Sequence, residues 1–154
     1  MGWLAIHDAA QHLAAARPHL VSLTQVVLGS TTVVQHALPH LFNSIPESYY
    51  ATLTETLESQ AQSVVAACSG VSGLQCITPQ GAMYVMVKLD LTAFRDIASD
   101  SEFAQKLLSE QNVMVLPGAC FNAPGFFRIV YCAPAPKLEE FAQRLAAFCK
   151  EHAA

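Results

Sequence analysis

Apolar residues recur every three or four positions in some parts of the chain and every second position in others, which separates expected helices from expected strands. The longest helical pattern follows residues 43–47 and ends at Ser69-Gly70, where glycine favours a stop. Its expected apolar face consists of Tyr50, Leu53, Leu57, Ala61, Val64, Val65 and Cys68. The clearest alternation covers residues 82–89, where every second residue is apolar and predicts one buried side of a strand.

From residue 44 onward the pattern predicts a closed series of elements: helix, strand, strand, helix, strand, strand, helix. The strands are expected at 74–78, 82–89, 112–116 and 126–132. The second helix is expected after Asp100-Ser101 and the last one after residues 134–136. This order is typical of an α+β layer, a small sheet with helices packed on it. We therefore place the main boundary near Asn43.

The first forty or so positions are less regular. Met1–Asp8 reads as a short apolar strand, followed by a helical stretch through Ala16, and Pro18 suits the first turn of a new helix. That helix is expected to present Leu20, Leu23, Val26 and Val27 on one face. Ser30 can cap a further helix from Thr31 to about Leu38, where Pro39 would interrupt a longer one, and the alternative is a helix that continues to Phe42.

Composition limits the function classes. The chain has 154 residues, of which 53% are hydrophobic and 13% charged, with a net charge of −4. This is the length of one ordinary domain, or of a small domain with part of another. The eight lysines and arginines do not cluster, which argues against a nucleic-acid-binding surface. The mean hydropathy of +0.33 is high for a free-standing domain and suggests surface that a partner or another part of the chain covers.

The apolar stretches do not predict a membrane protein. No window of about 18 residues is free of polar breaks, so we expect no membrane span. The first residues lack the form of a signal peptide. The five cysteines contain no CxxC pair, and we expect reduced thiols in a cytoplasmic compartment.

Arg128 is the most informative residue, because it lies in the otherwise apolar segment 126–131. A guanidinium keeps its charge, and burying one without a partner is costly. Its planar fork can hold a carboxylate or phosphate through two parallel hydrogen bonds. The alternative is structural: Arg128 lies on the solvent side of an edge strand or pairs with an acidic residue of the chain.

The loop before this strand is a second candidate. Pro117-Gly118 ends one expected strand, and the following residues include Phe121 and Gly125. Loops of this kind let the backbone approach a ligand closely. A plain strand connection with turn residues explains the same spacing.

No catalytic residue and no metal site emerge from the sequence. His36 and His40 are four residues apart, but Pro39 lies between them and no acidic residue follows at a useful spacing. No serine lies in a GxSxG motif, and none of the four lysines has the apolar surroundings that a Schiff-base lysine needs. The chain thus offers a carboxylate clamp without a catalytic group, which suggests part of an enzyme.

Three sequence blocks change this picture when they are taken together. They are Pro79-Gln80-Gly81-Ala82-Met83-Tyr84, Val113-Met114-Val115-Leu116-Pro117-Gly118 with Phe121, and Gly125-Phe126-Phe127-Arg128-Ile129. In this order and at these separations they resemble the C-terminal part of the class I and II aminotransferases that use pyridoxal 5'-phosphate. Residues 31–35 and 147–152 share the likeness, which is greatest to the branch of the family that acts on tyrosine.

The resemblance implies a fold and a domain division. Residues 44–154 would form the C-terminal small domain, and residues 1–43 would be the end of the large cofactor-binding domain of a three-layer α/β enzyme. Met1-Gly2-Trp3 would match the end of a segment in which the preceding arginine helps to hold the cofactor phosphate. The lysine that forms the Schiff base would then lie upstream of the chain.

The resemblance also implies an activity. Family enzymes are homodimers that move an amino group from an amino acid, here an aromatic one, to a 2-oxo acid such as 2-oxoglutarate or pyruvate. Arg128 would bind the substrate α-carboxylate. Pro117, Gly118 and Phe121 would line the substrate loop. By itself the chain is expected to be inactive.

Two other interpretations remain at this point. The chain could be a truncated, inactive paralogue that pairs with a full-length subunit through residues 1–43. It could also be an unrelated α+β domain in which Arg128 is simply salt-bridged.

Overall fold

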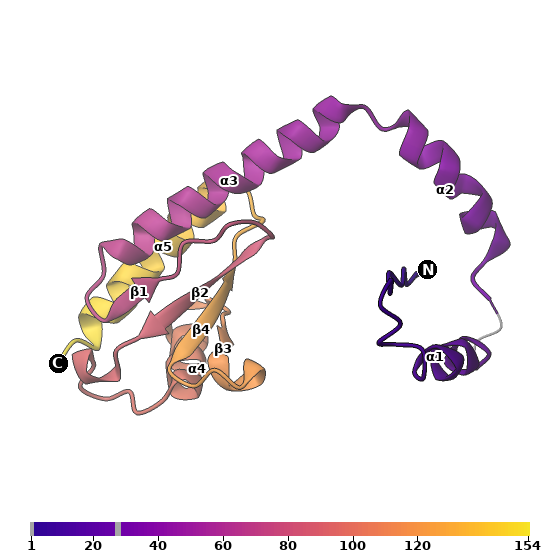
Figure 1. The fold of residues 1–154 in the computed structure, drawn as a ribbon. Helices are drawn as coiled ribbons and strands as arrows, with labels where there is room; N and C mark the ends of the chain where they lie inside the picture. The colour runs from indigo at the N-terminus through magenta and orange to yellow at the C-terminus, as the bar shows by residue number, and fades with distance from the viewer. Residues whose placement is uncertain (1, 27–28) are drawn as a thin grey trace. The chain divides into compact units, whose positions relative to one another are not determined.

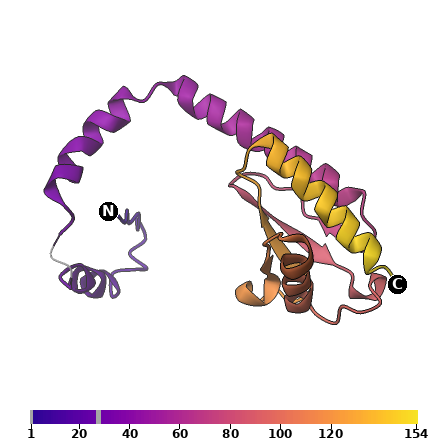
Figure 2. The ribbon, with the colours of Figure 1, turned by 180° about the vertical axis from the view of Figure 1, so that it is seen from behind.

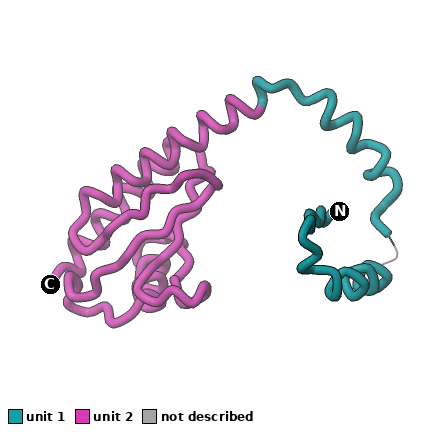
Figure 3. The backbone as a smooth tube through the Cα atoms, viewed as in Figure 1, with its two compact units in different colours: residues 1–49 teal, residues 50–154 magenta. Residues whose placement is uncertain are grey.

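The computed structural model of the chain describes residues 2–26 and 29–154, which form two compact units, residues 1–49 and 50–154 (Figures 1 and 3). The helices are α1 (Arg17–Thr24), α2 (Thr32–Ser44), α3 (Glu47–Ser69), α4 (Asp100–Gln111) and α5 (Ala135–Glu151), with two short 3-10 helices, η1 (Leu91–Ala93) and η2 (Gly118–Phe121). The strands are β1 (Leu74–Cys76), β2 (Tyr84–Leu89), β3 (Leu116–Pro117) and β4 (Phe126–Val130). The division between the units falls within α3, a few residues after the boundary expected near Asn43. The assignment of 44–154 to one domain stays a prediction.

The first unit differs from the sequence-based expectation in three places. Residues 2–8 form no strand, because a strand needs a paired neighbour and no described strand pairs with them. Residues 9–16 form hydrogen-bonded turns rather than a helix, because Gln11 adopts a left-handed backbone with φ of 56°. The N-cap position of α2 is Thr31 and not Ser30, and the Thr31 side chain makes no capping hydrogen bond.

The rest of this unit follows the pattern. Pro18 lies in the first turn of α1, where proline costs no hydrogen bond, as predicted. Helix α2 includes Pro39 and continues to Ser44, beyond the expected end near Leu38. Met1 and Val27, which the expected strand and helix face included, lie outside the described residues.

The second unit is a four-stranded antiparallel sheet with the strand order β1-β2-β4-β3. Three helices supply the buried residues that pack against one face of this sheet: α3, α4 and α5. In Figures 1 and 2, α3 and α5 run side by side on this covered side. The predicted order of helices and strands is confirmed.

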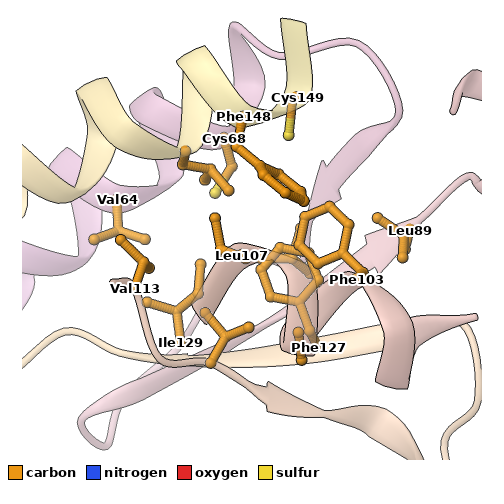
Figure 4. Close-up of a cluster of buried hydrophobic side chains, with 14 of the residues drawn as sticks. Val64, Cys68, Leu89, Phe103, Leu107, Val113, Phe127, Ile129, Phe148 and Cys149 are labelled. Carbon is orange, nitrogen blue, oxygen red and sulfur yellow. The ribbon is translucent and has the colours of Figure 1, made fainter. Parts of the chain in front are cut away.

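The core of the second unit is aromatic at its centre. The Phe103 ring of α4 stacks on Phe127 of β4 with centroids 4.9 Å apart, and Phe148 of α5 meets it edge-on at 5.3 Å (Figure 4). Such pairs add to the free energy gained from apolar burial. Cys68 and Cys149 lie in the same core, where burial raises the pKa of each thiol to about 12 and leaves it unreactive.

All four strands are shorter than predicted, and the third differs most. The expected strand 112–116 is reduced to Leu116–Pro117, because Asn112 ends α4 in a left-handed conformation with φ of 53°. Val113 and Val115 are still buried in the core, although they do not pair in the sheet. Burial rather than pairing thus explains the apolar alternation in this segment.

Candidate carboxylate-binding site

Arg128 lies at the middle of β4, which is a central strand and not an edge strand. It is in register with Met86 on β2 and Leu116 on β3. Its neighbours in sequence, Phe127 and Ile129, are buried in the core. Because side chains alternate along a strand, Arg128 points to the face of the sheet that α3, α4 and α5 leave uncovered.

The guanidinium of Arg128 lies over two aromatic rings. Its central carbon is 4.3 Å from the ring centre of Phe121 and 4.9 Å from that of Tyr84, both within the range of a cation–π interaction. Phe121 comes from η2, and Tyr84 begins β2. The rings fix the guanidinium but offer no lone pair in its plane, so its N–H groups still need acceptors.

The N–H at Nε of Arg128 has no acceptor. The Nε atom is buried, and no hydrogen-bond partner lies within reach among residues 2–26 and 29–154. No carboxylate of this described part forms an ion pair with the side chain. A buried donor without an acceptor costs free energy, and an oxygen anion would remove that cost. Both structural alternatives, a solvent-facing edge position and an internal salt bridge, are wrong.

The structure places the three predicted loop residues differently. Phe121 contacts the Arg128 guanidinium directly. Pro117 pairs with Phe127 in the sheet, one position along from Arg128. Gly118 is buried where the loop folds back on itself, and a Cβ atom there would lie 2.0 Å from the carbonyl oxygen of Ala123. Only glycine fits at this position.

Tyr84 belongs to the site although the sequence reasoning did not single it out. It begins β2, which runs beside β4, and its partner in the register is Val130, two residues from Arg128. Diagonal neighbours on one face of a sheet come within reach of long side chains. Alternation along residues 82–89 could have found it, since Tyr84 lies on the side opposite to the buried residues.

A second polar cluster surrounds His152. Its ring nitrogens contact Asp96 at 2.8 Å through Nδ1 and Glu110 at 2.8 Å through Nε2. Burial opposes a charge on this ring, but the hydrogen bonds to Glu110 and Asp96 outweigh it and raise the pKa of His152. The two contacts of the ring tie the end of α5 to α4 and to the segment before it, and the protonated ring can donate a hydrogen bond from each nitrogen.

No lysine among the described residues suits a Schiff base, which needs a neutral amine in an apolar pocket. Lys88, Lys137 and Lys150 are exposed. Lys106 is partly buried, and although desolvation acts against it, its ion pairs with Asp96 and Glu102 raise the pKa of its ammonium. Likewise, the described residues contain no group of three or more histidine, cysteine or acidic side chains that could hold a metal ion.

Comparison with known proteins decides the family. The family model described as "Aminotransferase class I and II" matches residues 1–145 of the chain. The chain belongs to the class I and II aminotransferases. Both the mixed helix-and-sheet fold and the likeness derived from the three sequence blocks are thereby confirmed.

Individual aminotransferases show the same relationship. Tyrosine aminotransferase from Dictyostelium discoideum is 42% identical over 99% of the chain, which corresponds to 38% of that protein. The mouse (Mus musculus) tyrosine aminotransferase is 37% identical over 99% of the chain and 34% of its own length. The crystal structure of tyrosine aminotransferase from Leishmania infantum superposes with a TM-score of 0.85 at 32% identity, covering 94% of this chain and 36% of that one. The chain therefore spans about a third of the length of its relatives.

Class I and II aminotransferases depend on pyridoxal 5'-phosphate, and the residues of this chain do not by themselves fit that cofactor. Its covalent attachment needs the kind of lysine that the described residues lack. The site that these residues do build is a single cation over two aromatic rings.

The described helices also include none long and apolar enough to cross a membrane.

Proposed function

We propose that this chain supplies the substrate-carboxylate site of an aminotransferase that acts on aromatic amino acids. The observation that carries the proposal is the buried, unpartnered Nε of Arg128 on the uncovered face of the sheet. Arg128 would donate two parallel hydrogen bonds to the α-carboxylate of the substrate. An amino acid and a 2-oxo acid share this carboxylate, so one arginine can orient both substrates of a transamination.

The surroundings of Arg128 support an aromatic substrate. Tyr84, Phe121 and Val130 are partly exposed on the same face or its rim, and Met86 lies beside Arg128 in the register. These side chains present apolar surface next to the cation, which favours a ligand with a carboxylate at one end and an apolar group at the other. The likeness to tyrosine aminotransferases supports the same substrate class.

The chain alone is proposed to lack transaminase activity, because none of its described lysines is enclosed in an apolar pocket. Incubation of the 154-residue chain with pyridoxal 5'-phosphate, reduction with borohydride and mass measurement test this point. We expect no stoichiometric label. One cofactor bound at a single lysine would contradict it.

The carboxylate site is tested by ligand-detected NMR titration of the chain with 3-phenylpropionate, which has the carboxylate and ring of the proposed substrate. The neutral analogue 3-phenyl-1-propanol separates the contribution of the carboxylate from that of the ring. We expect the acid to bind at least about tenfold more tightly than the alcohol, since charge-assisted bidentate hydrogen bonds are strong.

Two variants assign that difference to a residue. Arg128→Gln should abolish the preference for the acid. Arg95→Gln is the matched control, because Arg95 is an exposed arginine whose guanidinium contacts the carbonyl of Glu151 instead. Equal losses in both variants, or an unchanged preference in Arg128→Gln, would refute the proposed site.

A further inference from the structure

The position of Phe121 over the guanidinium depends on the short turn η2, which follows β3. The turn closes on itself through the N–H of Ala123, which donates to the carbonyl of Gly118 at 3.0 Å. This hydrogen bond closes the turn, but it does not fix the height of the turn above the sheet. That height needs a contact from outside the turn.

Asp100 provides such a contact. Its Oδ2 accepts a hydrogen bond from the N–H of Ala119, in the middle of η2, at 2.9 Å. Among the described residues it is the one side chain outside the turn that hydrogen-bonds to residues 118–121. Asp100 is the first residue of α4, so the carboxylate connects a rigid helix of the core to the turn that carries Phe121.

Asp100 is an unusual residue to bury. Its exposed fraction is 5%, and no lysine, arginine or histidine of the described chain pairs with it. A buried carboxylate needs strong donors in place of water. Those donors are two backbone N–H groups, that of Ala119 and that of Ser101, the latter at 2.8 Å from Oδ1.

The start of α4 does not require this carboxylate as a cap. Ser99 is the N-cap residue, and its hydroxyl accepts from the N–H of Glu102 at 3.1 Å. Glu102 in turn accepts from the N–H of Ala98 at 2.8 Å. These two hydrogen bonds resemble a capping box, except that Glu102 accepts from the residue before the N-cap, and they serve the helix end without Asp100. The second oxygen of Asp100 is therefore directed at the turn.

We infer that Asp100 is a positioning residue of the carboxylate site: its hydrogen bond to Ala119 holds η2 so that Phe121 lies over the guanidinium of Arg128. The inference rests on the proposed function of Arg128 and adds a residue that does not touch the substrate. The chain of contacts runs from the helix α4 through Asp100, Ala119 and Phe121 to Arg128.

The experiment compares Asp100→Ala with Ser99→Ala, each in the full 154-residue chain. Both changes remove a hydrogen bond at the same helix end, but only the first releases η2. The readouts are the affinity for 3-phenylpropionate, by ligand-detected NMR, and the nuclear Overhauser contacts between the Phe121 ring and the Arg128 side chain. The thermal unfolding midpoint shows how far each change weakens the fold.

We expect Asp100→Ala to bind the probe about tenfold more weakly than the parent chain and to lose the Phe121–Arg128 contacts. Ser99→Ala should keep both. Asp100→Asn should restore the affinity to within about threefold of the parent, because its amide oxygen can still accept from Ala119. A merely structural role would instead make the two alanine variants alike.

A change on the turn covers the case in which Asp100→Ala does not fold. Ala119→Pro removes the donor and leaves α4 intact, and it should weaken probe binding by a similar factor. If Asp100→Ala, or Ala119→Pro in its place, binds the probe as tightly as Ser99→Ala, the positioning role of Asp100 is wrong. The proposed carboxylate-binding role of Arg128 is then unaffected. If the parent chain does not bind the probe at all, the proposed function of Arg128 fails, and the positioning role fails with it.

Discussion

Residues 1–49 and 50–154 both contain many apolar residues but use them differently. Neither α1 nor α2 has a buried residue, and Trp3, Val33 and Phe42 are strongly exposed. Every member of the hydrophobic core found in the described chain lies between Ala61 and Cys149. The second unit therefore has its own core, while the first presents apolar surface that its own residues do not cover.

This contrast shows what an apolar pattern can and cannot predict. Periodicity predicts that a segment will be helical and which face is apolar. It does not say whether the residues that bury this face belong to the same chain. The family relationship covers both units, since the match extends over residues 1–145.

The largest expected effect on stability comes from replacing one phenylalanine with alanine in each unit and comparing the two losses. Phe103→Ala removes a fully buried ring that contacts Phe127 and Phe148, and we expect it to lower the free energy of unfolding by about 3–5 kcal/mol. Phe42→Ala removes a ring that is 65% exposed and should change the free energy of unfolding by less than about 0.5 kcal/mol. Chemical denaturation followed by circular dichroism measures both. Similar losses would show that the first unit has a core of its own.

Two glycines sharpen the comparison at the backbone. Gly118→Ala would place a Cβ atom 2.0 Å from a backbone oxygen, and we expect it to cost about 1–3 kcal/mol in stability and to weaken binding of 3-phenylpropionate. Gly29→Ala meets no atom within 4 Å and should be neutral within about 0.5 kcal/mol. Denaturation midpoints measure the stability of the two variants, and titrations with 3-phenylpropionate measure their affinity. Parental stability and affinity in the Gly118→Ala variant would contradict the tight turn.

The smallest expected effect is a pH dependence confined to the second unit. The raised pKa of His152 means that the folded chain holds a proton that the unfolded chain loses near pH 6.5. This stabilisation is complete below about pH 6.5 and is lost as the pH rises toward the folded pKa. We expect the free energy of unfolding to fall as the pH rises from about 6 to about 8.

His152→Gln provides the control for this pH dependence. It cannot take up the proton, so its stability should be flat over the same interval and lower than that of the parent at the acidic end. The interval ends at about pH 8 because unfolded cysteines begin to ionise above it. A parental curve as flat as that of the variant would show that His152 carries no charge in the folded chain.

Local sequence was sufficient for much of the fold. The helix that ends at Ser69-Gly70, the alternation in β2 and the proline in the first turn of α1 each follow from nearby residues alone. The failures came where tertiary context decides. Residues 2–8 are apolar but have no strand to pair with, and the segment before Leu116 is apolar because it is buried rather than paired.

The site was only partly predictable for the same reason. Arg128 stood out because a permanent charge interrupted an apolar strand. Tyr84 and Asp100 reach the site through contacts with residues far away in sequence, and neither position looks exceptional without the sheet register or the turn. The ion cluster around His152 joins residues 56 positions apart and leaves no local sequence signal.

The account depends most on the Nε–H group of Arg128, and NMR can observe this group directly. In the free chain its resonance should be slow to exchange, since the atom is buried away from water. Addition of 3-phenylpropionate should shift this resonance in a saturable way, while 3-phenyl-1-propanol should leave it in place. A resonance that exchanges rapidly with water, or that does not respond to the acid at saturating concentration, would contradict the central claim.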